Sequence, residues 1–310
     1  MLQVQQLQFS YLNQVTLSNL SFELETGQLL AVIGESGCGK STLLKLIYGL
    51  YDADKGHIFW KNQQVLGPKY HLIPGMPYMK YLAQDFDLMP FITVAENVGK
   101  YLSNFFPEEK KQRTAELLEL VEMSDYAHVK AKFLSGGQMQ RVALARVLAL
   151  EPEVLLLDEP FSHIDSFRKH SLRRKLFAYL KKKQITTLVA THDSTDILSF
   201  ADEILVLKEG NLWIQGSTKE IYSKPETFYT ASLFGEVSKF PSHCFHTEEE
   251  LFLYPHQLAF SLVGEVQIEV VQSYFRGGYY LVQAQFDSGI LYFEHADFLE
   301  TGTRGYVIQK

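Results

Sequence analysis

The segment GESGCGKST, residues 34–42, combines the residue types that bind phosphate groups. Its pattern is G-x-x-x-x-G-K-[ST], in which glycines let successive backbone N–H groups curve around an anion. Lys40 brings a positive charge to phosphate oxygens, and the hydroxyl of Ser41 is a suitable ligand for Mg²⁺. The sequence therefore predicts a nucleotide site. The residues that we assign to it here are Gly34, Glu35, Ser36, Gly37, Cys38, Gly39, Lys40, Ser41 and Thr42.

Two acidic residues, Asp158 and Glu159, end the apolar run in EVLLLDEP. Alone, Asp158 could be a helix cap and Glu159 a surface charge. A phosphate loop in the same chain favours another interpretation, because ligands of open parallel sheets bind at the carboxyl ends of the strands. Asp158 is then the carboxylate on the Mg²⁺ side, and Glu159 is the base that orients and deprotonates an attacking water.

His192 ends another apolar run, in TTLVATHD. A single histidine is more often a satisfied core or surface group than a catalyst. This one, however, is expected at the same sheet edge as Asp158 and Glu159. An imidazole there can hydrogen-bond a terminal phosphate and hold water in line for attack. We therefore count His192 among the candidate catalytic residues.

Two adjacent glycines stand at the start of a predicted helix in KFLSGGQMQR. Ser135 and Gln138 have the spacing of a capping box, and the apolar residues after them recur at helical intervals. This does not explain Gly136 and Gly137, because each costs about 1 kcal/mol relative to alanine in a helix. Glycine lets a large group approach the backbone closely, and a helix N-terminus attracts anions. We therefore assign all four residues to a second phosphate contact.

The elements that must position these groups alternate between strands and helices over residues 1–235. Apolar runs at 29–33, 154–158, 186–191 and 204–207 predict strands, and amphipathic helices separate them. This alternation is typical of an α/β fold, with a mostly parallel sheet covered by helices. Strand signals vanish between about 94 and 150, so we predict a helical insert there, with one helix beginning at Pro107.

Over residues 236–310 the apolar period changes to two, which predicts a small all-β barrel. Its aromatic residues could in principle stack on single-stranded nucleic acid. After residue 239, however, the sequence has only three basic residues and has nine acidic ones, so a cationic groove is missing. We therefore expect the rings to fill the barrel core. These aromatic residues are Tyr274, Phe275, Tyr279, Tyr280, Tyr292 and Phe293.

The composition is that of an ordinary globular protein of two domains: 310 residues, 46% of them hydrophobic and 21% charged. No apolar run approaches the roughly 20 residues that span a bilayer, and the first residues lack a signal-peptide pattern, so we expect a cytoplasmic location. The two cysteines, Cys38 and Cys244, form no disulfide framework. A net charge of −7 argues against broad nucleic-acid binding.

In this order, the segments GESGCGKST, YLAQDF, LSGGQMQR, EVLLLDEP and ATHD resemble the ATP-binding cassette (ABC) family of transporter ATPases. The resemblance covers the first domain and implies the P-loop ATPase fold of this family, with ATP and Mg²⁺ as cofactors. It implies that Gln84 is the lid-loop glutamine, which contacts Mg²⁺ and water. Asp165 would link the two sites of a dimer. Tyr11 resembles the aromatic residue that stacks on adenine, with Phe9 as the alternative.

The resemblance also implies how the two phosphate contacts meet. Cassettes of this family pack head to tail in pairs, so Ser135 and Gly137 of one chain would face the ATP held by residues 34–42 of the other. The tail is similar to the accessory barrel of oligonucleotide/oligosaccharide-binding (TOBE) type that follows the cassette in importers of iron, polyamines, inorganic anions and sugars. Its segment FLYPHQL, at 252–258, looks like the opening of that barrel.

The function that we favour is the ATPase subunit of an importer, peripheral on the inner face of the membrane. Its implied partners are a second cassette, transmembrane permease subunits that dock near residues 84–101, and a periplasmic or extracellular solute-binding protein. One alternative is a soluble ABC-type ATPase of DNA repair or translation, which the single LSGGQ segment and the acidic charge disfavour. Another is a ligand-sensing role for the barrel. The segment GPKYHLIPGMPYMKY, before Gln84, is longer than expected and stays unexplained.

Overall fold

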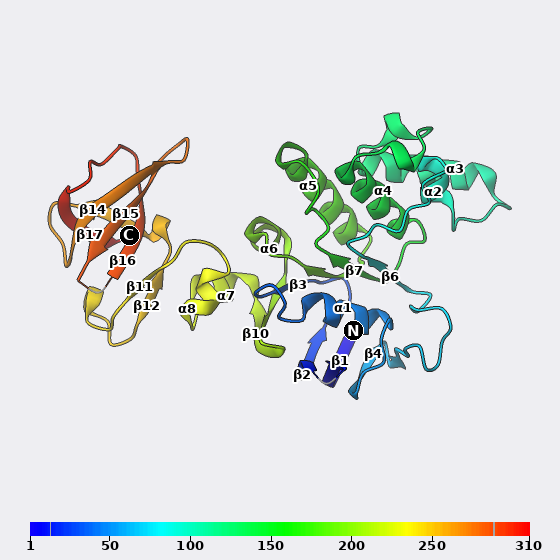
Figure 1. Cartoon of the computed structure of the whole chain (residues 1–310), viewed down its shortest axis with the longest axis horizontal. Coiled ribbons are helices and arrows are strands. Elements are labelled where there is room, and N and C mark those ends of the chain that lie inside the picture. Colours follow the sequence, from blue (N-terminus) through cyan, green and yellow to red (C-terminus); the bar gives the residue numbers. More distant parts are fainter. Residues whose placement is uncertain (13, 288) are drawn as a thin grey trace. The chain divides into compact units, whose positions relative to one another are not determined.

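The computed structural model describes residues 1–12, 14–287 and 289–310. It divides the chain into two compact units, Met1–Thr218 and Lys219–Lys310 (Figure 1). The first unit is α/β and the second is mainly antiparallel β, so the predicted fold class is confirmed. The domain boundary at residues 235–236 stays a prediction. In the described part of the chain, no helix has both the length and the apolar character needed to cross a membrane.

The first unit contains ten strands and six helices in the described residues. Its strands are β1 (Leu2–Tyr11), β2 (Gln14–Leu24), β3 (Leu29–Ile33), β4 (Lys55–Trp60), β5 (Gln63–Gln64), β6 (Met79–Leu82), β7 (Val154–Asp158), β8 (Thr186–Ala190), β9 (Glu203–Lys208) and β10 (Asn211–Ser217). Its helices are α1 (Lys40–Tyr48), α2 (Val94–Gly99), α3 (Pro107–Leu120), α4 (Gly136–Leu148), α5 (Ser166–Lys182) and α6 (Ser194–Phe200), with 3₁₀ turns η1 (Ser124–Tyr126) and η2 (Ala131–Phe133).

A six-stranded sheet forms the centre of this unit, in the order β10-β9-β3-β8-β7-β6. Its strands pair in parallel except β10, which is antiparallel to β9. Every residue of β3, β7 and β8 is buried, which explains why these strands read as continuous apolar runs and not as alternating ones. The four strands expected from the sequence are present within a residue of the expected bounds.

Alternate residues of the central strands face two separate hydrophobic cores. Leu155 and Leu157 of β7 pack with α3, α4 and α5, whereas Val154 and Leu156 pack with α1 and with β1 and β2. The second core includes a four-stranded antiparallel sheet, in the order β2-β1-β4-β5, that the sequence pattern did not distinguish. Figure 1 shows the helices α2 to α5 on one side of the central sheet and α1 with the antiparallel strands on the other.

The predicted helical insert corresponds to α2, α3 and α4, all within residues 94–150. Pro107 is the first residue of α3, where the N–H that proline lacks is not needed. Ser135 caps α4, and the predicted capping box is present, because the Gln138 side chain also accepts from the Ser135 backbone N–H. The helix that presents the two glycines therefore begins where the sequence placed it.

The second unit is built around a five-stranded antiparallel sheet, in the order β13-β17-β14-β15-β16, with a separate β11-β12 pair. Val266, Ile268 and Val270 lie in its core, as their alternation predicts. Its strands and helices are β11 (Ser238–Phe240), β12 (Leu251–Leu253), β13 (Leu258–Ser261), β14 (Val266–Phe275), β15 (Tyr280–Phe286), β16 (Gly289–His295), β17 (Arg304–Gln309), α7 (Thr218–Ser223), α8 (Phe228–Ser232), η3 (Cys244–His246) and η4 (Pro255–Gln257).

The expectation that the aromatic residues of this unit all fill its core is wrong for three of them. Phe293 is fully buried, but Tyr274, Phe275 and Tyr279 are exposed. The reason is the length of β14: it pairs with β17 only over residues 266–269 and continues beyond, paired with β15 alone. Figure 1 shows this hairpin of β14 and β15 extending from the body of the sheet.

Candidate functional site

Three neighbouring parallel strands bring the predicted site residues to one edge of the central sheet. The phosphate loop follows β3, Glu159 follows β7 and His192 follows β8 within two residues, and these strands are adjacent in the order β3-β8-β7. In the register, Asp158 of β7 is paired with Ala190 of β8. The carboxyl ends of parallel strands are the usual place for ligands in such sheets. The site is thus assembled by strand order, as the sequence predicts.

The phosphate loop requires its glycines for two physical reasons. Gly34 has φ of +146°, and a Cβ on it would lie 2.2 Å from the carbonyl oxygen of Leu207. Gly37 has φ of +84°, while no described residue lies within 4 Å of the position its Cβ would take, so its backbone is accessible from outside. The Lys40 ammonium donates to the carbonyl oxygens of Gly34, at 2.8 Å, and Glu35, at 3.0 Å. Its charge therefore lies over the loop.

A cavity of 570 Å³ adjoins this loop and has an aromatic residue on its wall. Tyr11 lines it together with Gly37, Gly39 and residues 40–42, and Tyr11 is 40% exposed. Phe9, the alternative stacking residue, is buried and makes an edge contact with the Tyr11 ring at 4.8 Å between centroids. The geometry therefore favours Tyr11 over Phe9 as a surface for a flat ring. Ser36 and Glu35 are exposed at the tip of the loop, and the Cys38 side chain is buried beneath it.

The predicted metal ligands meet at the start of α1 and the end of β7. The Ser41 hydroxyl donates to Oδ1 of Asp158 at 2.9 Å. This separation is close to the spacing of about 2.9 Å between neighbouring ligands of a Mg²⁺ ion with bonds of about 2.0–2.1 Å. One hydroxyl and one carboxylate, both hard oxygen donors, suit a Mg²⁺ ion that takes its other ligands from phosphate and water. The residues present therefore fit the ion.

Gln84 lines a second cavity, of 550 Å³, that reaches the same two groups. Ser41 and Asp158 are on its wall, together with Phe86 and Arg146. Gln84 is exposed, in the loop that follows β6. The Arg146 side chain donates to the backbone carbonyl oxygens of Phe86 and Asp87, which both have φ values in the left-handed region. Arg146 of α4 thus supports the loop that carries Gln84.

Glu159 and His192 form a direct pair. Nδ1 of His192 lies 2.8 Å from Oε1 of Glu159. A carboxylate oxygen accepts hydrogen bonds, so Nδ1 is the donor of this pair and Nε2 is the ring nitrogen left for other partners. The Glu159 side chain is mostly buried, whereas that of His192 is 75% exposed. The histidine therefore extends from the carboxylate towards the solvent side of the site.

Glu159 has a left-handed backbone, with φ of +49°. Its N–H donates to the carbonyl oxygen of Ala190, and its own carbonyl accepts from the Gln140 side chain at 2.9 Å and from the Ser162 hydroxyl at 3.1 Å. A non-glycine residue in this conformation persists only when its surroundings hold it, and such residues gather at functional sites. Gln140, which the sequence did not single out, is one of the groups that hold it.

A buried ionic cluster lies behind His192. Arg173 of α5 pairs with Asp193 and, through Nε at 2.5 Å, with Oδ1 of Asp196. Burial raises the pKa of Asp196 to about 7, although the guanidinium acts in the opposite direction. Burial is the largest single influence on Asp193 and acts to raise its pKa, but the hydrogen bond and charge of Arg173, together with the hydrogen bonds of Thr195, outweigh it and lower the pKa of Asp193. One guanidinium thus keeps Asp193 ionised next to the histidine, while Asp196 takes up a proton readily.

The Asp196→Asn variant is expected to lose a pH dependence of stability. The folded-state pKa of Asp196, about 7, lies above its ordinary value of 3.8. The folded protein therefore binds more protons between pH 4 and 7, so the contribution of this group to the free energy of unfolding falls as pH rises through that window. The slope is at most about 1.4 kcal/mol per pH unit. Urea unfolding at pH 5 and pH 7.5 measures it. If the free energy of unfolding falls equally from pH 5 to pH 7.5 in the variant and in wild type, the assignment is contradicted. Asp125→Asn, which changes an exposed residue, is the control.

The two glycines of the 135–138 segment differ in their surroundings. A Cβ on Gly137 would lie 2.6 Å from the carbonyl oxygen of His163, whereas the nearest described atoms to a Cβ on Gly136 belong to the His163 side chain, at 3.9 Å. Gly137 is therefore also required by a loop of the same chain, which the sequence did not reveal, whereas the space beside Gly136 is open and Ser135 is exposed. None of the described residues that line the cavity at the phosphate loop comes from 135–138.

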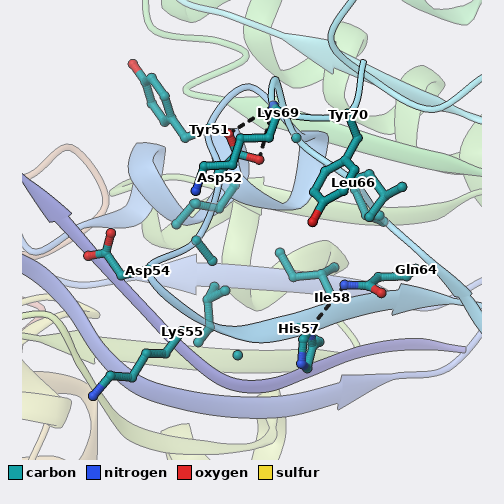
Figure 2. Close-up of a pocket in the computed structure, with 16 residues that line it drawn as sticks. Tyr51, Asp52, Asp54, Lys55, His57, Ile58, Gln64, Leu66, Lys69 and Tyr70 are labelled. Carbon is teal, nitrogen blue, oxygen red and sulfur yellow. Dashed lines mark hydrogen bonds between the residues drawn. The ribbon is translucent and has the colours of Figure 1, made fainter.

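A further hollow, of 460 Å³, lies between β4, β5 and the loop that follows β5 (Figure 2). The backbone N–H of Lys69 donates to the Asp52 carboxylate at 3.2 Å, and the side chains of Gln64 and His57 are 3.0 Å apart. None of the predicted site residues lines it. The first part of the long segment before Gln84 thus forms one wall of this hollow, and its last residues form β6.

Comparisons with known proteins agree on the family. The family described as ABC transporter matches residues 17–162. An Fe(3+) ions import ATP-binding protein, FbpC 1 of Rhodococcus jostii, is 42% identical over 232 residues, covering 73% of this chain and 65% of that protein. The chain thus spans less than two thirds of that relative. A sulfate/thiosulfate import ATP-binding protein, CysA of Gloeobacter violaceus, is 36% identical over 253 residues, which are 79% of this chain and 72% of that protein.

A solved structure supports the same assignment. The dimeric structure of a post-hydrolysis state of the ATP-binding cassette MJ0796, bound to ADP and Pi, has a TM-score of 0.61 and 27% sequence identity, covering 70% of this chain and 99% of that one. The segment matched by the family includes the phosphate loop, residues 135–138 and Asp158 with Glu159. The sequence similarity, the shared fold and the site assembled at the strand ends lead to one conclusion: the chain belongs to the ATP-binding cassette transporter family.

Proposed function

We propose that this chain is the ATP-hydrolysing subunit of a solute importer and that it works as a pair of cassettes. The observation that carries the proposal is the arrangement at the edge of the central sheet. There, the phosphate loop, the Ser41–Asp158 pair and the Glu159–His192 pair follow three adjacent strands. A phosphate cradle, a place for a divalent cation and a base paired with a histidine are the groups that nucleotide hydrolysis needs.

In the proposed reaction, a water molecule attacks the γ-phosphorus of ATP. Glu159 accepts a proton from the water as its oxygen bonds to phosphorus, the bond from phosphorus to the bridging oxygen breaks, and ADP and phosphate result. His192, held by Glu159 through Nδ1, has its Nε2 side turned outward and orients the water and the γ-phosphate. Lys40 balances the charge of the phosphate oxygens. A bound Mg²⁺ ion, held by Ser41 and Asp158 with Gln84 near it, would neutralise developing charge.

The second cassette completes the proposed site. Ser135 is exposed at the N-terminus of α4, where backbone N–H groups point outward. It is absent from the described residues on the wall of the cavity at the phosphate loop of its own chain. A helix N-terminus binds anions well, so we assign Ser135, Gly136, Gly137 and Gln138 to the γ-phosphate of ATP on a second copy. The solved cassette with the TM-score of 0.61 is itself dimeric.

We propose that membrane subunits dock on the helical side of the cassette, near residues 84–101. Large apolar side chains are exposed there, among them Phe91 at 71% and Tyr101 at 53%. Solvent exposure of several aromatic rings in one segment marks an interaction surface. The docking partner is a permease, and a solute-binding protein delivers the cargo to it. The chain would then lie at the cytoplasmic face of the membrane, where ATP is available.

We propose the oligonucleotide/oligosaccharide-binding type of accessory barrel for the antiparallel unit, with a regulatory or structural task. Its five-stranded sheet and single core support this. The names of the two import relatives favour an importer over a role in DNA repair or translation, and they favour ferric iron or an inorganic anion as its cargo. Polyamines and sugars are the other cargo classes that we propose from the resemblance of the accessory barrel.

The function is tested by the rate of phosphate release from ATP by the purified chain, with Mg²⁺ and after chelation by EDTA. We expect steady-state hydrolysis that disappears with EDTA and returns with added Mg²⁺. Uptake of labelled ferric iron, sulfate and spermidine by cells without the chain then separates the cargo classes. Absence of hydrolysis with saturating ATP, Mg²⁺ and co-purified membrane subunits would overturn the proposal.

The Tyr11→Ala variant is expected to bind ATP more weakly, by about 5- to 150-fold, because base stacking on an aromatic ring is worth about 1–3 kcal/mol. Titration with a fluorescent ATP analogue measures the affinity. Tyr70→Ala removes an exposed ring elsewhere in the chain and is the matched control. An affinity in Tyr11→Ala equal to that of the control would assign the adenine contact to another group.

A further inference from the structure

A tyrosine hydroxyl lies against the carboxylate predicted to serve the metal. Tyr81 belongs to β6, which pairs in parallel with β7, and β7 ends at Asp158. The Tyr81 hydroxyl donates to Oδ2 of Asp158 at 3.1 Å, while the Ser41 hydroxyl donates to Oδ1 at 2.9 Å. The two oxygens of one carboxylate therefore have separate donors, which come from different elements of the fold.

The chemical nature of this donor matters for a cation site. Asp158 is 3% exposed, and a buried carboxylate needs hydrogen bonds to replace its lost hydration. A phenol hydroxyl supplies one without bringing a positive charge, whereas a lysine or arginine in its place would neutralise the carboxylate. The full negative charge of Asp158 thus stays available to a divalent ion.

The ring of Tyr81 is fixed by the helix that carries the other ligand. It packs on the ring of Tyr48 in α1, with 5.6 Å between centroids and an interplanar angle of 36°. Ser41 is the second residue of α1. Tyr81 therefore contacts both elements that carry the predicted metal ligands, and it precedes Gln84 by three residues in the same segment.

From these contacts we propose that Tyr81 is a positioning residue for the metal: its hydroxyl holds Oδ2 of Asp158, so that Oδ1 alone faces Ser41 and receives Mg²⁺. This inference rests on the proposed ATPase function. Groups that hydrogen-bond to metal ligands orient them, and their loss typically weakens metal binding by about 10- to 100-fold. Tyr81 does not touch the nucleotide in this account, so its effect is confined to the ion.

The test is the Tyr81→Phe variant of the full chain, which removes the hydroxyl and keeps the ring. Binding of Mn²⁺, followed by its electron paramagnetic resonance signal in the presence of a non-hydrolysable ATP analogue, is expected to weaken by about 10- to 100-fold. Affinity for the analogue in EDTA is expected to match wild type. In hydrolysis assays, the metal concentration for half-maximal rate rises by the same factor, while the rate at saturating metal stays close to that of wild type.

Tyr78→Phe is the matched control. The Tyr78 hydroxyl is buried, has no hydrogen-bond partner among the described residues, and its ring stacks on Trp60 away from Asp158. This variant is expected to bind Mn²⁺ as wild type does. Should Tyr81→Phe fail to fold, Tyr81→Met fills the space without a hydroxyl and carries the same expectation.

Three results would overturn the inference. Unchanged Mn²⁺ affinity in Tyr81→Phe shows that the hydroxyl does not hold the metal carboxylate. A parallel loss of analogue affinity in EDTA and of thermal stability shows a structural role only. If wild type itself fails to bind Mn²⁺ together with the analogue, the proposed function falls first and the inference falls with it, so the two failures are distinguishable.

Discussion

The Glu159→Gln variant is expected to hydrolyse ATP about 10²- to 10⁴-fold more slowly than wild type while it binds ATP with unchanged affinity. This range is the usual contribution of a positioned general base. Glutamine has nearly the shape of glutamate but cannot accept a proton from water. Its amide oxygen still accepts from Nδ1 of His192, so the contact of 2.8 Å is preserved and the loss is chemical rather than structural. Single-turnover phosphate release measures the rate, and equilibrium titration measures the affinity.

A conservative change elsewhere controls for the loss of one negative charge. Glu116 lies on α3 in a surface ion pair with Arg113. The hydrolysis rate of Glu116→Gln is expected to equal that of wild type. If Glu159→Gln retained steady-state turnover, Glu159 would not be the base, and the left-handed backbone at this residue would need another explanation.

The Ser135→Arg variant is expected to slow hydrolysis by at least about 100-fold, equivalent to about 2.7 kcal/mol, while one chain alone binds ATP as wild type does. Ser135 is exposed at the start of α4, so a bulky side chain fits in the isolated chain. In the proposed pair, the same side chain would occupy the position of the γ-phosphate contact and keep the cassettes apart. The hydrolysis rate is measured, and an ATP titration of the same preparation measures the affinity.

Loss of the helix cap must be separated from loss of the interface, because replacing an N-cap serine costs about 0.5–2 kcal/mol. Ser135→Asn keeps a good cap without charge, and Ser135→Asp keeps a cap but places a carboxylate towards the phosphate. We expect Ser135→Asn to hydrolyse ATP faster than both Ser135→Asp and Ser135→Arg. Weaker ATP binding by Ser135→Arg as a single chain would place Ser135 at the nucleotide of its own chain instead.

Much of the site was predictable because its residues lie at the ends of fully buried strands. The apolar runs of β3, β7 and β8 mark the strands, and the groups that follow them meet at one sheet edge, since parallel strands place their carboxyl ends together. The capping box at Ser135 is local in sequence, so its four residues are enough to predict it. Motifs of this kind need no knowledge of distant contacts.

The contacts that the sequence did not reveal are those between segments far apart in the chain. Gly137 is fixed by the carbonyl oxygen of His163, and no spacing rule connects the two residues. Tyr81 reads as one more strand residue until the pairing of β6 with β7 brings its hydroxyl to Asp158. Gln140 sits among buried residues of α4, and a polar residue at such a position was the one signal that pointed to it.

The exposed rings of Tyr274, Phe275 and Tyr279 show the same limit for the second unit. Alternation correctly predicts which face of β14 is buried near its start. It does not reveal where the neighbouring strand ends, and that end decides which rings lie in the core and which lie in the hairpin beyond it. Register is set by packing between strands, so a pattern within one strand cannot supply it.

The central claim is that two chains close over ATP, and the mass of the Glu159→Gln variant in solution tests it most directly. Analytical ultracentrifugation of this variant, without nucleotide and then with saturating ATP, follows the change. We predict one chain of 35.5 kDa without ATP and a species of twice that mass with ATP, because slow hydrolysis preserves the ATP that joins the pair. A species that remains at the mass of one chain with ATP bound would contradict the account.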